Sequence, residues 1–349
     1  MKSVFARIAL ISFLLVLFIP NSAFAKMKTF IKEYTYRASE ADSKLSSRTT
    51  ATAEVKRLLL EELGTYLESI TEVKNFQLTK DQITALTAGI VKTEIIDEKW
   101  NGETYWIKTK MAADSDDVIK SIDKLRKDRN KLQELEDTKK KADVLLEENK
   151  KLREELAQAK GNAKLEVQQR YDSSIKKLSA IEWFESAWRN YNNGDNETAV
   201  RHYTKAIELN PNYADVYLNR GSAYYFLGKY NEAIADYNKA IELNPNAAYA
   251  YSARAFAYYI LGKYHEAIVA YNKAIELNPN AADAYLNRGS AYYSLGKYHE
   301  AFADYNKAIE LNPNYADAYY GRGLAYNGLG KHDEATADFK KAKELKAKR

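Results

Sequence analysis

The second half of the chain repeats one pattern of apolar and polar positions every 34 residues. Within residues 214–246, small and aromatic residues recur at three- and four-residue spacing, which predicts two helices that each bury one side. Gly228 and Lys229 interrupt this pattern midway. Asn244 and Pro245 end it, because the residue before a proline is disfavoured in the helical conformation. A fixed period of this length predicts a stack of helix pairs, since one pair alone cannot bury its apolar side.

Repeated words in the sequence divide this half into five units. KAIELNPN occurs four times, starting at Lys205, and LGKY occurs three times, starting at Leu227. The second helix of each unit alternates alanine with tyrosine or phenylalanine, a spacing that lets two helices interdigitate at native density. We therefore expect a mainly α protein whose C-terminal array has units at residues 180–213, 214–247, 248–281, 282–315 and 316–349.

The fixed positions of each unit closely resemble the tetratricopeptide repeat. The residues that carry the resemblance are the first-helix aromatics Trp183, Tyr217, Tyr251, Tyr285 and Tyr319 and the turn glycines Gly194, Gly228, Gly262, Gly296 and Gly330. The first unit departs from the pattern at Asn190 and Asn196, and the last lacks the proline, as expected for terminal units that face water on one side. The resemblance implies an α-solenoid whose concave groove binds a protein or peptide partner.

The same resemblance implies that the first helices line the concave side. Amide and tyrosine side chains there suit an extended peptide, because amides pair with its backbone and tyrosine rings contact side chains at low entropy cost. No lysine occupies these positions, which argues against a clamp for a peptide carboxylate. The alternative is a general scaffold in which these residues merely belong to a common version of the repeat. The positions expected to form the groove are Phe184, Trp188, Tyr191, Leu218, Asn219, Ser222, Tyr225, Phe256, Tyr259, Asn287, Ser290 and Tyr293.

Four arginines recur in register where the family usually has an apolar residue: Arg220, Arg254, Arg288 and Arg322. An unpaired buried arginine is costly, so one hypothesis pairs each with a nearby acid such as Asp236, Asp304 or Asp338. The other hypothesis is a charged ladder that recognises an acidic partner.

The first 25 residues have the pattern of a secretory signal. Lys2 and Arg7 form a charged start, residues 8–19 form an apolar core, and Ala23 to Ala25 suit cleavage. The apolar run is short for a membrane span, although an uncleaved anchor is the alternative. The chain has no cysteine, which fits a periplasmic or envelope-associated bacterial protein better than a disulfide-stapled extracellular module.

Residues 26–113 predict a small α+β domain. Strand-like composition at residues 30–36 precedes a helical pattern over 39–70, and Asn101–Gly102 predicts a hairpin between strands at 90–96 and 104–111. The run SSRTTATAEVKRLLLEELGTYLES and the hairpin after it resemble the small envelope domain of flagellar outer-ring assembly proteins and related surface lipoproteins. That resemblance implies a bacterial, envelope-located domain without enzymatic activity.

Residues 114–179 predict one long charged helix. Leu145, Asn149, Leu152 and Leu156 recur at coiled-coil spacing, which predicts a homodimer whose register is set by the asparagine. The alternative is a single solvated helix. A continuous helix would be about 95 Å long and would act as a spacer, with a hinge expected at Gly161–Asn162.

Charge and motifs exclude several function classes. The 53 basic and 48 acidic residues nearly cancel, which does not suggest nucleic-acid binding. We find no cysteine cluster or paired histidines for a metal, no phosphate-binding glycine loop and no nucleophile–base pair, so we expect no cofactor and no enzyme. The sequence therefore predicts an exported, non-enzymatic adaptor that binds a protein or peptide. The alternative is an accessory to polysaccharide or peptidoglycan machinery whose aromatic groove holds sugar rings.

Overall fold

The computed structural model describes residues 27–70, 73 and 75–347, so the expected signal at residues 1–25 lies outside the described part. The described residues form three strands and fourteen helices. The N-terminal part of this body contains β1 (Met27–Arg37), α1 (Lys44–Glu68), α3 (Lys80–Ile90), β2 (Thr93–Trp100) and β3 (Thr104–Asp114).

The three strands form an antiparallel sheet with β3 in the middle. The hairpin expected at Asn101–Gly102 is confirmed: Gly102 has φ +96°, and the Asn101 side-chain oxygen accepts hydrogen bonds from the backbone of Glu103 and Thr104 at 3.0 and 2.7 Å. The strand expected from residue 90 begins only at Thr93. Ile90 instead ends α3, a helix that starts with a capping box at Thr79 and that the apolar pattern did not reveal.

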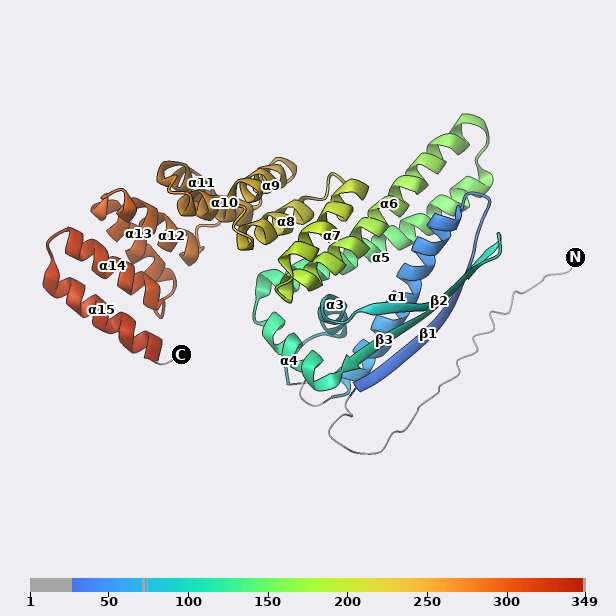
Figure 1. Cartoon of the computed structure of the whole chain (residues 1–349), viewed down its shortest axis with the longest axis horizontal. Coiled ribbons are helices and arrows are strands. Elements are labelled where there is room, and N and C mark those ends of the chain that lie inside the picture. Colours follow the sequence, from blue (N-terminus) through green and yellow to red (C-terminus); the bar gives the residue numbers. More distant parts are fainter. Residues whose placement is uncertain (1–26, 71–72, 74, 348–349) are drawn as a thin grey trace, which may run out of the picture.

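One apolar core runs from the sheet into the array. Leu63 of α1, Phe30 of β1 and Trp188 of the first helix pair belong to the same cluster of buried side chains, which continues to Tyr203 and Val216. The domain boundaries expected near residues 113 and 179 therefore do not interrupt the core. The sheet, its helices and the first two units are built as one body (Figure 1).

The expected long helix is a wrong prediction, because the structure has three helices there. These are α4 (Ser115–Arg126), α5 (Arg129–Gln158) and α6 (Gly161–Asn192). The chain reverses between α5 and α6, where Gly161 adopts φ +58°, at the position expected for a hinge. Helices α5 and α6 lie side by side as a hairpin (Figure 1), so no spacer of that length forms.

The coiled-coil seam packs within the chain rather than on a second copy. Leu152 and Leu156 of α5 form a cluster with Tyr171 and Ile175 of α6. Asn149 is only 2% exposed. The apolar residues on which the homodimer prediction rested are therefore already covered, and that prediction loses its physical basis.

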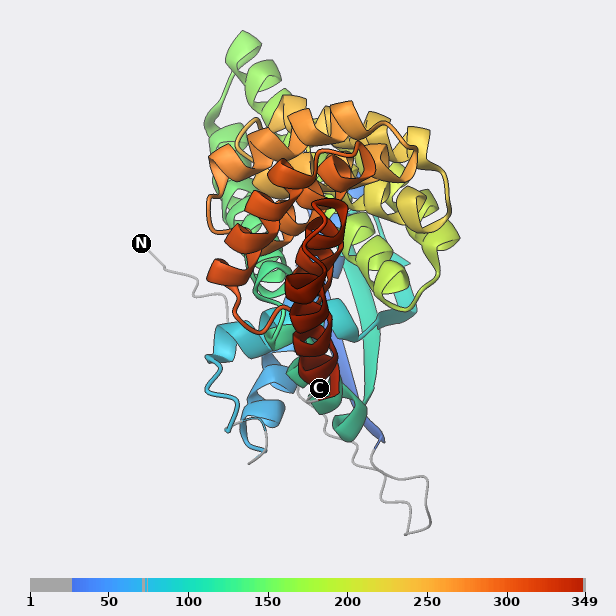
Figure 2. The same cartoon turned by 90° about the vertical axis from the view of Figure 1, so that its left-hand side faces the viewer.

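The array continues from α6 as pairs of antiparallel helices that lead away from the body, and it curves as it does so (Figures 1 and 2). A Cβ atom on Gly221 or Gly323 would lie 2.7 Å from the ring of Tyr237 or Phe339, so only glycine allows this close packing. The five turn glycines have φ between +72° and +83°, as their turn position requires. The remaining helices are α7 (Asn196–Leu209), α8 (Ala214–Phe226), α9 (Tyr230–Leu243), α10 (Ala248–Ile260), α11 (Tyr264–Leu277), α12 (Ala282–Ser294), α13 (Tyr298–Leu311), α14 (Ala316–Gly328) and α15 (His332–Ala347).

In the part of the chain that the structure describes, no helix has both the length and the apolar composition needed to cross a bilayer.

Candidate partner-binding surface

Aromatic rings form a connected row on the side of the array that carries the first helices α6, α8 and α10. Successive ring centroids in this row lie 5.5–6.3 Å apart. Phe226 is 64% exposed, whereas its neighbours are half-buried. We call the row the aromatic ladder; it consists of Tyr191, Phe226, Tyr225, Phe256, Tyr259 and Tyr264.

The ladder contains four of the residues expected in the groove and two that the sequence did not single out. Phe226 and Tyr264 were missed, although Tyr264 belongs to the repeated word LGKY and that repetition was a usable signal. Its counterpart Tyr298 packs against the expected groove residue Tyr293 at 5.5 Å. The tyrosine that starts each second helix thus extends the aromatic surface of the first.

Three further groove positions bind their own chain. Ser222 and Ser290 donate hydrogen bonds to the carbonyls of Leu218 and Leu286 at 3.1 and 3.0 Å. The same serines accept hydrogen bonds from the buried tyrosines of the second helices, at 3.5 Å for Tyr237 and 3.3 Å for Tyr305. Leu218 is half-buried against two apolar clusters. These residues shape the surface by holding the two helices of a unit together.

Helix α5 covers the beginning of the expected groove. The Trp188 indole donates a hydrogen bond of 3.0 Å to one carboxylate oxygen of Glu134, and the Asn219 amide donates to the other. Phe184 is fully buried against Tyr203 and Tyr213. Phe184, Trp188 and Asn219 were therefore wrongly predicted as free groove residues, because a helix distant in sequence packs over them.

The contact with α5 continues along one face of that helix. Thr138, four residues after Glu134, is 2% exposed. Lys141, three residues further, forms an ion pair of 2.7 Å with Asp215 and lies over the ring of Tyr213 at 4.9 Å. Positions separated by three and four residues share one side of a helix, so this face of α5 is shaped to the array.

Burial raises the pKa of Glu134 to about 7, against the hydrogen bonds from Trp188 and Asn219, which favour the charged form. The nearby charge of Asp215 raises this pKa further, and that of Lys131 lowers it. Desolvation, with the charge of Glu134, also raises the pKa of Tyr249 on α10, although that side chain is 60% exposed. Tyr249 therefore points toward α5 and marks the edge of the covered stretch.

Beyond α10 the first-helix side is open. Asn287 on α12 is half-buried and makes no hydrogen bond among the described residues. It stands 68 residues after Asn219, which occupies the same position two units earlier. Tyr320 on α14 is 50% exposed. The open stretch thus offers the same side-chain types as the covered one, without an internal partner.

The repeated arginines are structural ties rather than a ladder. Arg220, Arg288 and Arg322 each hold an aspartate of the second helix through two nitrogens at 2.6–2.8 Å. Arg254 differs because Ala270 stands where the aspartate would be. It donates to the side chain of Asn238 at 2.7 Å and leaves its Nε without a partner. Three of the four positive charges are therefore neutralised within the chain.

No group of three or more His, Cys, Asp or Glu side chains in the described ranges could hold a metal ion. The titratable residues with large pKa shifts, Glu134 among them, are explained by burial in the core.

Profiles of the tetratricopeptide repeat match the array almost from end to end. One matches residues 190–228, 257–296 and 289–330, a second matches 214–247 and 316–348, and a third matches 236–269. With the antiparallel helix pairs and the turn glycines, these matches decide the family. The chain is a tetratricopeptide repeat protein.

Relatives of this tetratricopeptide repeat protein cover its array. An uncharacterized protein of Methanocaldococcus jannaschii is 42% identical over 61 residues, which are 18% of this chain and 69% of that protein. The crystal structure of MamA is 36% identical and covers 46% of this chain and 95% of its own, with a TM-score of 0.44. YrrB, described as a tetratricopeptide repeat protein with an unusual peptide-binding site, is 25% identical and covers 48% of this chain and 86% of its own, with a TM-score of 0.43.

Proposed function

We propose that this protein is a non-enzymatic adaptor that binds an extended segment of a protein partner along the first-helix side of its array. The aromatic ladder carries this proposal, because it is a connected row of rings with an exposed member at Phe226. Rigid aromatic rings contact partner side chains at low entropy cost, and such residues dominate binding energy at interfaces. The open amide of Asn287 adds a group that can pair with a peptide backbone.

The test is to pan a random peptide library against the purified chain and measure selected peptides by fluorescence anisotropy. Phe256→Ala removes the centre of the ladder, so we expect at least about tenfold weaker binding. Val269→Ala is the matched control, because Val269 lies in the same unit, on the second helix, and is 67% exposed. Peptides that bind the Phe256→Ala protein as tightly as the unchanged chain would refute the proposal.

An accessory role in polysaccharide or peptidoglycan machinery is the second candidate. The rings of Phe256 and Tyr259 are nearly parallel, with an interplanar angle of 8° and centroids 6.3 Å apart, and flat rings in this arrangement suit stacking of sugars. Peptidoglycan-derived saccharides that bind the chain, and that lose affinity on Tyr259→Ala, would favour this role over peptide binding.

We also propose that the protein is exported and resides in the periplasm or at the envelope of a bacterium. The support is the charged start, apolar core and Ala23-Phe24-Ala25 end of residues 1–25. Fractionation followed by N-terminal sequencing tests this directly. A mature chain that begins at Lys26 in the periplasmic fraction is the expected result, and an intact Met1 in the cytoplasmic fraction contradicts it.

A further inference from the structure

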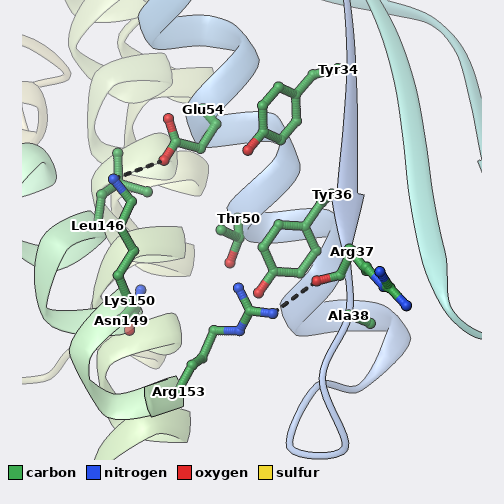
Figure 3. Close-up of a pocket in the computed structure, with 10 residues that line it drawn as sticks. All are labelled: Tyr34, Tyr36, Arg37, Ala38, Thr50, Glu54, Leu146, Asn149, Lys150 and Arg153. Carbon is green, nitrogen blue, oxygen red and sulfur yellow. Dashed lines mark hydrogen bonds and ion pairs between the residues drawn. The ribbon is translucent and has the colours of Figure 1, made fainter. Parts of the chain in front are cut away.

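A second cavity, far from the aromatic ladder, lies between the sheet and the helical hairpin. It has a volume of about 370 Å³, which falls within the range of small-molecule sites. Strand β1 and helix α1 form one side and helix α5 the other (Figure 3). The residues that line it are Tyr34, Tyr36, Arg37, Ala38, Thr50, Glu54, Leu146, Asn149, Lys150 and Arg153.

Two buried polar side chains in this lining have no hydrogen-bond partner. Asn149 is 2% exposed, and both its amide nitrogen and its amide oxygen are unpaired. Thr50 is 8% exposed, and its hydroxyl is also unpaired. An unpaired buried polar group is destabilising, and native structures retain few of them. The neighbouring buried positions Leu152 and Leu156 show that a leucine would suit this face of α5 better for stability alone.

The charged residues of the lining are mostly positive. Lys150, Arg153 and Arg37 stand against the single acid Glu54. Arg153 donates to the backbone carbonyl of Arg37 at 2.8 Å and lies over the ring of Tyr36 at 4.7 Å. The Lys150 ammonium lies 3.7 Å from Glu54. In Figure 3, Lys150 and Arg153 reach into the cavity from α5 toward the tyrosines of β1.

The neighbouring acids neutralise only part of this charge. Asp42 lies 3.2 Å from Nε of Arg153, and Glu147 lies 2.6 Å from Lys150. Glu54 is also shared, because Arg57 donates to it at 3.0 Å. Lys150 keeps 53% of its side chain exposed, so its ammonium remains accessible to a further anion.

We propose that this cavity binds a small molecule with an amide and a free carboxylate, such as an N-acylated amino acid or a short acylated peptide. The amide of the ligand pairs with the donor and the acceptor of Asn149, and its carboxylate lies between Lys150 and Arg153. The ring of Tyr34 and the side chain of Leu146 contact the apolar part. This site is independent of the groove, so either proposal can fail without the other.

The test uses isothermal titration calorimetry on the full chain with probes that separate the two recognised groups. N-acetyl-L-alanine and N-acetyl-L-alanyl-L-alanine carry both groups, N-acetyl-L-alaninamide lacks the carboxylate, and acetate and inorganic phosphate lack the amide. We expect at least one of the first two to bind with a Kd below about 1 mM and each of the other three at least about tenfold more weakly. No binding by either acylated acid, or equal binding by acetate, overturns the proposal.

Variants separate recognition from folding. Asn149→Leu removes the amide and fills its place with an apolar side chain, so it should weaken binding at least about tenfold while the melting temperature stays equal or rises. Lys150→Met should weaken binding several-fold, and Lys151→Met is its control, because the exposed Lys151 does not line the cavity. Unchanged affinity in Lys150→Met, or in a folded Asn149→Leu protein, contradicts the assigned site.

Discussion

The two ends of the first-helix side differ in what faces them. At the body end, Trp188 and Asn219 bind the Glu134 carboxylate of α5, whereas at the free end Asn287 occupies the position equivalent to Asn219 with no partner among the described residues. The repeat is the same at both ends. The comparison teaches that a position in such an array is structural or available for binding according to what the rest of the chain places against it.

The largest expected effect contrasts a covered aromatic with an open one. Trp188→Ala should lower the free energy of unfolding by about 3–5 kcal/mol, because Trp188 is 2% exposed in the shared core. Tyr293→Ala, in the open stretch, should cost about 1 kcal/mol. Urea-induced unfolding followed by circular dichroism measures both. Equal losses would show that the covered end is no more structural than the open one.

The second prediction concerns the buried carboxylate that joins the two regions. The folded-state pKa of Glu134, about 7, exceeds its unfolded value near 4.5, so the folded chain binds more protons between these values. Stability should therefore fall as pH rises through this range, and the full penalty applies above pH 7. Between pH 5 and 8 the unchanged chain should lose about 2–3 kcal/mol relative to Glu134→Gln. Parallel pH profiles of the two proteins would contradict the burial of this charge.

The third prediction compares arginines in equivalent positions. Arg288→Gln breaks a two-nitrogen ion pair with the buried Asp304 and should cost about 2 kcal/mol. Arg254→Gln, where the acid is absent, should change stability by less than about 0.5 kcal/mol. Ala270→Asp supplies the missing acid and should stabilise the chain by about 1 kcal/mol. Thermal unfolding tests all three, and a destabilising Ala270→Asp would show that Arg254 cannot adopt the geometry of its counterparts.

The smallest effect tests the two asparagines. Asn219→Ala removes a hydrogen bond to a charged group and should cost about 1–2 kcal/mol. Asn287→Ala should leave stability within about 0.5 kcal/mol and weaken a selected peptide instead. Pairing each melting curve with an anisotropy titration checks this division. The reverse pattern, with binding lost on Asn219→Ala alone, would place the binding surface at the body end.

The sequence predicted the features that depend on short-range pattern. The five units, the turn glycines and the Asn101–Gly102 hairpin follow from residues that are close in the chain, and the structure agrees with them. The ladder was predicted in part, since Tyr225, Phe256 and Tyr259 recur at the register of the repeat.

The features that were missed depend on contacts between distant segments. Gly161 was recognised as a hinge, but only the packing of Leu152 on Tyr171 shows that the chain folds back there. Glu134 lies in a helix rich in charge, and nothing local separates it from Glu136. Its role follows from Trp188 and Asn219, which are 54 and 85 residues away.

The continuity of the core from the sheet into the first units also separates two properties of the array. Each distal unit contacts mainly its neighbours, as in other stacked repeats. Duplication or loss of one 34-residue module near the C-terminus would leave the anchored end unchanged. The reach of the binding side can therefore vary, in evolution or by engineering, without redesign of the body that holds it.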